Sequence, residues 1–126
     1  WVNDAIDGPQ RLQFVDDLMP ELTKMSKRKA LLLSGGQQKM VALGRALIAG
    51  EKLLLLDEPF EGVAPALAKR ISDVITSLKG DGLSVLIAQS ELSHSSDLLQ
   101  RESVIERGEI IKVNVIDPAF AQRVPV

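Results

Sequence analysis

Four consecutive leucines, followed at once by two carboxylates and a proline, constrain the fold of this chain more than any other feature. The run Leu53–Leu56 continues into Asp57, Glu58 and Pro59, and Gly50 precedes it. An apolar run without polar alternation, bounded by glycine and proline, predicts a short strand buried on both faces, as in a parallel sheet. The two carboxylates then lie at the C-terminal edge of that strand.

The segments around this strand alternate between helix and strand. Apolar residues recur at helical spacing over 37–49 and again after Pro65, and a second apolar run occupies 83–88. Because consecutive parallel strands need a helical crossover, this order predicts an α/β fold, with parallel strands and flanking helices.

The two ends of the chain carry shorter elements. A helix is predicted to begin at Pro9 and to end or kink at Pro20, since proline lacks the N–H that a helix interior needs. Near the C-terminus we expect a short helix over 91–99 and a hairpin over 103–113 that turns at an Arg-Gly pair. No pattern is evident over 118–126.

Composition excludes several classes of site. The chain has 126 residues, a formal net charge of -2 and no cysteine. It therefore has room for one small domain, and it can form neither disulfides nor thiolate metal sites. A nucleic-acid-binding protein would normally carry a basic excess, so no nucleic acid is expected as a partner. No apolar run approaches the ~20 residues that span a bilayer.

A Ser-Gly-Gly turn at 34–36 stands directly before the helix predicted over 37–49. Glycines let a backbone approach an anion closely, and the free N–H groups of a helix N-terminus attract negative charge. The Ser34 hydroxyl adds a donor, and Gln37 adds polar reach in the first turn. The alternative is an ordinary glycine-rich loop in which Ser34 caps the helix.

Asp57 and Glu58 are neighbours at the end of the predicted strand. Successive side chains of a strand point in different directions, which suits two separate roles. The alternative is a surface turn after a core strand.

In order and spacing, Leu33–Gln37 and Leu53–Pro59 resemble the signature motif and the Walker B motif of ATP-binding-cassette (ABC) ATPases. The stretch 44–47, Gly-Arg-Ala-Leu, matches the family between them. No Gly-x-x-x-x-Gly-Lys-Ser/Thr phosphate loop occurs in the chain. The resemblance, which runs from about 10 to 111, therefore implies the C-terminal part of a nucleotide-binding domain with a partial P-loop NTPase fold.

By this resemblance, Ser34, Gly35 and Gly36, with Gln37 beside them, would contact the γ-phosphate of an ATP molecule held by a different subunit. The cofactors implied are ATP and Mg²⁺. The partners implied are a second ABC ATPase domain, identical or different, and membrane permease subunits, at the cytoplasmic face of the plasma membrane.

The resemblance also implies roles at the strand ends. Asp57 would support Mg²⁺, often through water, and Glu58 would orient or deprotonate the attacking water. Gln89 stands at the switch position, which is usually histidine; glutamine can donate a hydrogen bond there but carries no charge. The single histidine, His94, is a less favoured substitute, and a solvated helix residue is the simpler interpretation.

One departure from the common pattern narrows the resemblance. Where many ABC ATPases carry Ser-Ala-Leu-Asp, residues 61–65 read Glu-Gly-Val-Ala-Pro, with Ala64 in place of the aspartate. This variant, together with Gln89, resembles importer subunits for branched-chain amino acids and urea. It implies an ATPase subunit of an ABC importer that energises uptake of such solutes.

The resemblance divides the chain into three parts. Residues 1–36 are expected to be a remnant of the helical signature subdomain, 37–114 the C-terminal part of the RecA-like catalytic core, and 115–126 a tail. The missing initiator Met agrees with a truncated start. Without the phosphate loop, we expect this chain alone to be inactive and to bind Mg-ATP weakly, and unpaired strand edges favour self-association.

Two other classes of protein stay open. One is a soluble ABC ATPase of DNA repair or translation, which would carry a coiled-coil insertion or tandem cassettes. The other is a stand-alone half-cassette without ATPase activity that binds a partner cassette. A neighbouring permease gene would favour the importer over the soluble ATPase, and a long heptad insertion upstream would favour the soluble ATPase.

Overall fold

The computed structural model describes residues 8–50, 52–79, 82–90 and 98–117, and the chain divides into two compact units, 1–91 and 92–126. The first unit is α/β, as predicted, and the second is a hairpin. In chain order, the elements of the first unit are α1 (Gly8–Leu18), α2 (Pro20–Met25), the 3₁₀ helix η1 (Ala30–Leu32), α3 (Gly35–Ala49), β1 (Leu53–Asp57), α4 (Pro65–Ser77) and β2 (Ser84–Ala88).

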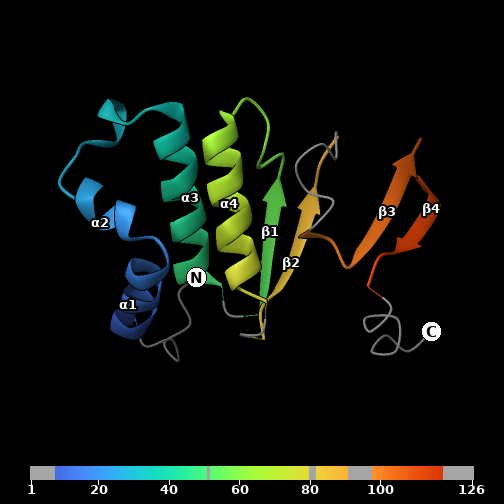
Figure 1. Ribbon diagram of the computed structural model, residues 1–126, viewed down its shortest axis with the longest axis horizontal. Coiled ribbons are helices and arrows are strands. Elements are labelled where there is room, and N and C mark those ends of the chain that lie inside the picture. The colour runs from blue at the N-terminus through green and yellow to red at the C-terminus, as the bar shows by residue number, and fades with distance from the viewer. Residues whose placement is uncertain (1–7, 51, 80–81, 91–97, 118–126) are drawn as a thin grey trace. The chain divides into compact units, whose positions relative to one another are not determined.

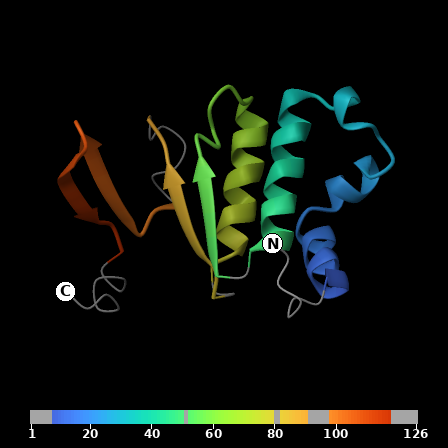
Figure 2. The same ribbon diagram turned by 180° about the vertical axis from the view of Figure 1, so that it is seen from behind.

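The two strands of the first unit form the parallel pair that the sequence predicts. Leu53 lies opposite Ser84 and Asp57 opposite Ala88, so the C-terminal ends of β1 and β2 coincide. Both views show α4 beside β1 and α3 beside α4 (Figures 1 and 2). The N-terminus of α3 and the C-terminal ends of both strands therefore lie at the same end of this unit.

The core lies between the helices and one face of β1. It is built from the periodic apolar positions of α3 and α4, which explains why those stretches form amphipathic helices. The buried side chains of the first unit come from every helix but α2 and η1, from β1, and from the loops: Val15, Met19, Met40, Leu43, Leu47, Leu54, Phe60, Ala68, Ile71, Val74, Ile75 and Leu78.

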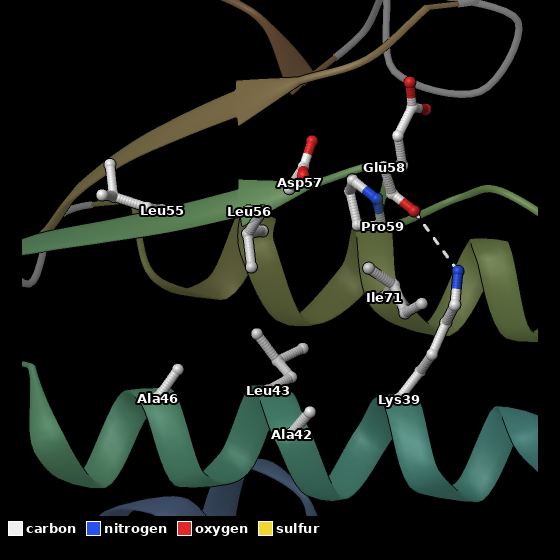
Figure 3. Close-up of a pocket in the computed structure, with 10 residues that line it drawn as sticks. All are labelled: Lys39, Ala42, Leu43, Ala46, Leu55, Leu56, Asp57, Glu58, Pro59 and Ile71. Carbon is white, nitrogen blue, oxygen red and sulfur yellow. Dashed lines mark hydrogen bonds between the residues drawn. The ribbon is translucent and has the colours of Figure 1, made fainter.

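The opposite face of the sheet differs from the prediction. Leu53, Leu55 and Leu86 are 53%, 64% and 61% exposed, so the expectation that both strands are buried on both faces is wrong for the described residues. Side chains alternate across a strand, so Leu54 is buried while its neighbours Leu53 and Leu55 are exposed. Figure 3 shows Leu56 pointing toward α3 and α4 and Leu55 pointing away from them. The exposed apolar face agrees with self-association, which stays a prediction.

Helix breaks at the N-terminus fall where proline requires them. α1 ends at Leu18, Met19 is wholly buried, and Pro20 opens α2 at its first position. Both helices pack on α3, where a Cβ at Gly44 would lie 2.5 Å from a methyl of Leu22. Glycine at that position therefore permits the close approach of α2 to α3.

No helix among the described residues is long and apolar enough to cross a membrane.

A bidentate ion pair joins α2 to α4. Arg70 Nε donates to Glu21 Oε1 at 2.7 Å, and Arg70 Nη2 donates to Glu21 Oε2 at 3.1 Å and to the Leu18 carbonyl at 2.7 Å. The hydrogen bond from Arg70 is the main cause that lowers the pKa of Glu21 from its ordinary 4.5. The guanidinium thus ties the N-terminal helices to α4.

Replacing Arg70 by methionine is expected to destabilise the fold in a pH-dependent way. Both side chains are 34% exposed, so solvent screens the pair and its contribution is about 0.5–1 kcal/mol. Because the folded state lowers the pKa of Glu21, this contribution is present above pH 4.5 and disappears as pH falls through the folded-state pKa. Thermal unfolding at pH 7 and pH 3 measures it: the difference between variant and wild type should shrink at pH 3.

The matched control is Lys69→Met, which removes a more exposed pair with Asp73 on the same helix. This control should change the melting temperature little at either pH. An Arg70→Met variant as stable as Lys69→Met at pH 7 would contradict the role given to the pair.

The second unit is the predicted antiparallel hairpin. β3 (Arg101–Glu106) pairs with β4 (Glu109–Val115), so β4 runs two residues beyond its predicted end. Arg107 and Gly108 both have positive φ, 52° and 85°, the backbone of a two-residue turn that matches strand twist. The helix predicted near 91–99 falls largely, and the 118–126 stretch wholly, outside the described residues.

Candidate functional site

The Ser-Gly-Gly turn forms a capping box at the start of α3. Ser34 Oγ accepts a hydrogen bond from Gln37 N at 3.3 Å, and Gln37 Oε1 accepts one from Ser34 N at 3.0 Å. This reciprocal pair explains why a helix begins here. It also turns the Gln37 side chain back on the backbone, whereas the Ser34 hydroxyl keeps its proton free to donate.

The two glycines of the turn differ in their surroundings. A Cβ at Gly35 would meet no atom within 4 Å, whereas a Cβ at Gly36 would lie 2.5 Å from Leu67 Cδ2 on α4. Gly35 is exposed. The backbone N–H groups of Gln37 and Gln38 donate hydrogen bonds to Ser34. Among the described residues, the N–H groups of Gly35 and Gly36, the first two of α3, have no hydrogen-bond acceptor. Free N–H groups at a helix N-terminus bind anions.

The strand ends bring Glu58 and Gln89 together, although they are far apart in sequence. Gln89 Nε2 donates to Glu58 Oε2 at 2.5 Å, and Ser90 N donates to Glu58 Oε1 at 3.0 Å. The Glu58 backbone N–H donates to the Ala88 carbonyl at 2.9 Å, which continues the parallel ladder by one residue. The sequence predicted Glu58 and Gln89 as site residues but gave no sign of Ser90.

Asp57 and Glu58 have different environments. Asp57 is exposed, and no described residue hydrogen-bonds its carboxylate. Glu58 is partly buried, and its φ of +46° is in the left-handed region, which a non-glycine residue adopts at a cost of about 1 kcal/mol. Figure 3 shows the Glu58 carboxylate pointing away from α3 while its backbone carbonyl faces Lys39. Among the described residues, the Asp57 carboxylate is thus free of hydrogen bonds, whereas that of Glu58 is fixed by two.

Lys39 is the contact that sequence reasoning missed. Its Nζ donates to the carbonyl of Glu61 at 2.5 Å and to that of Glu58 at 3.3 Å. No residue pattern predicts such a bond, because a lysine one turn into a helix is usually solvated. Lys39 also stands beside a pocket of about 220 Å³ between α3, α4 and β1 (Figure 3), whose apolar lining includes Leu43, Leu56 and Ile71.

The residues at the strand ends fit a magnesium ion that also holds phosphate. No three His, Cys, Asp or Glu side chains cluster as a metal cage within the described part of the chain. Mg²⁺ needs no such cage, since it keeps several waters and takes one or two carboxylates beside phosphate oxygens. Asp57 offers a free carboxylate. Gln89 Oε1 is buried without a partner among described groups, an acceptor suited to a bound water.

The described residues bring only part of the predicted site into contact. No hydrogen bond among them joins 34–37 to Asp57, Glu58 or Gln89. The turn and the strand ends share one end of the unit, but each has its own surroundings. His94 lies outside the described residues.

Comparison with known proteins gives consistent matches. A family model described as ABC transporter matches residues 9–61. The chain is 36% identical over 111 residues to the high-affinity branched-chain amino acid transport ATP-binding protein BraG of Pseudomonas aeruginosa, covering 88% of this chain and 48% of the relative. It is 38% identical over 104 residues to the lipopolysaccharide export system ATP-binding protein LptB of Haemophilus influenzae, covering 81% and 43%.

Solved structures agree with these matches. The ADP conformation of MJ1267, an ATP-binding cassette of an ABC transporter, has a TM-score of 0.78 at 32% identity, covering 93% of this chain and 46% of that one. The chain spans about half the length of the curated relatives it matches. It lacks a phosphate-loop motif and retains the turn and strand ends described above. The chain is therefore a partial ATP-binding cassette of the ABC transporter family.

Proposed function

We propose that this chain supplies the signature turn and the Walker B carboxylates of an ATPase that energises a transporter. The observation that carries the proposal is the cluster of Glu58, Gln89 and Ser90 N at the C-terminal ends of two parallel strands. Ligands of open α/β sheets bind at such ends. The family of the chain supports ATP as that ligand.

Each residue of the cluster has a distinct proposed task. Asp57 would hold Mg²⁺, which would supply positive charge beside the phosphate oxygens. Glu58 orients the attacking water and accepts its proton, and Gln89 and Ser90 N fix the two oxygens of that carboxylate. Phosphoryl transfer depends mainly on positioning and charge stabilisation, so a carboxylate held at both oxygens suits this step.

The signature turn acts on a different nucleotide. The free N–H groups of Gly35 and Gly36 and the Ser34 hydroxyl are proposed to bind the γ-phosphate of ATP on a second cassette. Among the described residues, no hydrogen bond joins this turn to the strand ends, which supports the division. Two cassettes would then join head to tail, each completing the other's site, with membrane permease subunits at the cytoplasmic face of the membrane. Within the chain, we propose that residues 1–36 are a remnant of the helical signature subdomain, that 37–114 are the C-terminal part of the catalytic core, and that 115–126 are a tail.

Branched-chain amino acids are the proposed transported solutes. BraG is one relative, and the probable branched-chain amino acid transport ATP-binding protein LivG of Methanocaldococcus jannaschii is 40% identical over 91 residues, covering 72% of this chain and 35% of the relative. The Glu-Gly-Val-Ala-Pro stretch at 61–65 adds support. Lipopolysaccharide export is the second candidate, since the LptB match has similar identity and coverage.

Uptake in cells distinguishes the two candidates. Deleting the gene is expected to abolish high-affinity uptake of radiolabelled leucine, isoleucine and valine, with uptake of an unrelated amino acid such as proline as the control. The full-length gene should restore uptake, and the same gene carrying Glu58→Gln should not. Unchanged leucine uptake with lipopolysaccharide retained in the inner membrane would favour the export system instead.

A further inference from the structure

The loop that follows β1 is anchored by one side chain of α3. Lys39 is the only lysine among the described residues that is not exposed. Its ammonium group bonds two backbone carbonyls, those of Glu58 and Glu61, on a loop about twenty residues further along the chain. A partly buried ammonium that donates to carbonyls of another segment fixes that segment's position, because releasing it would leave a charge poorly solvated.

The anchored loop begins at Glu58, a non-glycine residue with a left-handed backbone. Glu58 has φ of +46°, and its peptide carbonyl must turn toward α3 for Lys39 to reach it, as Figure 3 shows. With the carbonyl held on that side, the side chain leaves on the other side, where Gln89 and Ser90 N bind it. Lys39 and Gln89 thus hold opposite sides of one residue.

We propose that Lys39 is a positioning residue for Glu58. By fixing the carbonyls of Glu58 and Glu61, it stabilises the left-handed backbone that aims the Glu58 carboxylate. This inference rests on the role proposed for Glu58 in hydrolysis. It also joins two motifs physically, since Lys39 lies on the same helix that begins at the signature turn, and Leu67 of α4 packs on that turn at Gly36.

Variants of Lys39 in the full-length gene product test the proposal. Lys39→Met keeps an unbranched stem beside the apolar pocket but removes the donor, and Lys39→Arg keeps a charged donor. Lys69→Met, at an exposed site on α4, is the matched control for loss of one positive charge. Steady-state ATP hydrolysis gives kcat and KM, and hydrogen exchange with mass spectrometry reports on the backbone at 58–61.

In Lys39→Met, kcat should fall roughly ten- to hundredfold, as misplacement of a reacting group typically costs. The KM for ATP should stay within about twofold, since Glu58 acts on water and not on nucleotide binding. Exchange at the amides of Glu58 and Glu61 should become faster. Lys39→Arg should recover most of kcat, and Lys69→Met should match wild type.

Hydrolysis by Lys39→Met at the wild-type rate would overturn the proposal, as would a raised KM with unchanged kcat. An equal fall of kcat in Lys69→Met would mean that the loss of a positive charge alone explains the effect, and it would also overturn the proposal. If the wild-type product hydrolyses no ATP, the proposed function fails. Hydrogen exchange still tests whether Lys39 holds the loop: unchanged exchange at 58–61 in Lys39→Met overturns that role, and faster exchange supports it.

Discussion

Glu58→Gln in the full-length gene product is expected to lower kcat for ATP hydrolysis roughly a hundredfold or more, the usual loss when a general base is removed. ATP binding should persist, because the carboxylate acts on the nucleophile. The amide is nearly isosteric, but it carries no charge. Only its oxygen can accept a hydrogen bond, so it cannot satisfy both Gln89 Nε2 and Ser90 N.

The control for this variant is Glu61→Gln, three residues along the same loop. The Glu61 side chain is exposed and the residue contributes only its backbone to the Lys39 contact. Hydrolysis by this variant should match wild type. If Glu58→Gln were as active as Glu61→Gln, the carboxylate at 58 would be a surface turn after a core strand and not part of a catalytic site.

Gly35→Asp should lower ATP hydrolysis by about a hundredfold, the loss expected when a donor group for a developing anion is disabled. A Cβ at Gly35 meets nothing within 4 Å, and an acidic residue in the first turn favours the helix. The fold should therefore keep its melting temperature. The new carboxylate would repel the γ-phosphate that the free N–H groups of α3 are proposed to bind.

Gly35→Ala separates charge from size in the same position. The methyl group also has open space around it, so most activity should remain. Circular dichroism melting of both variants verifies the fold. A Gly35→Asp variant that hydrolyses ATP at the wild-type rate would show that this turn only caps α3.

Local sequence patterns predicted most of the fold. Pro20 and Pro65 fix helix boundaries, the apolar run at 53–56 specifies β1, and the Arg-Gly pair produces the two-residue hairpin turn. These features depend on residues that are neighbours in the chain, so they can be predicted from the sequence. The proximity of Glu58 and Gln89 was also predictable, since parallel strands bring their C-terminal ends to one edge.

Other features depend on contacts between distant segments. Leu55 belongs to a run that predicts burial on both faces, yet its exposure depends on which helices cover the sheet. Lys39 looks like a solvated helix residue until the loop after β1 lies beside it. The left-handed backbone of Glu58 likewise has no local signal, because glutamate does not favour positive φ. Propensity and periodicity carry no information on such pairings.

In the proposed dimer, the turn at Gly35 and the carboxylate at Glu58 act in the same nucleotide site but come from two copies of the protein. Mixing two inactive full-length variants, Gly35→Asp and Glu58→Gln, tests it directly. In a mixed dimer, one site combines an intact turn with an intact Glu58, and the other site has neither. Equimolar mixing should restore roughly a quarter of wild-type ATP hydrolysis, as random assortment of a symmetric dimer gives. A mixture as inactive as each variant alone would contradict the account.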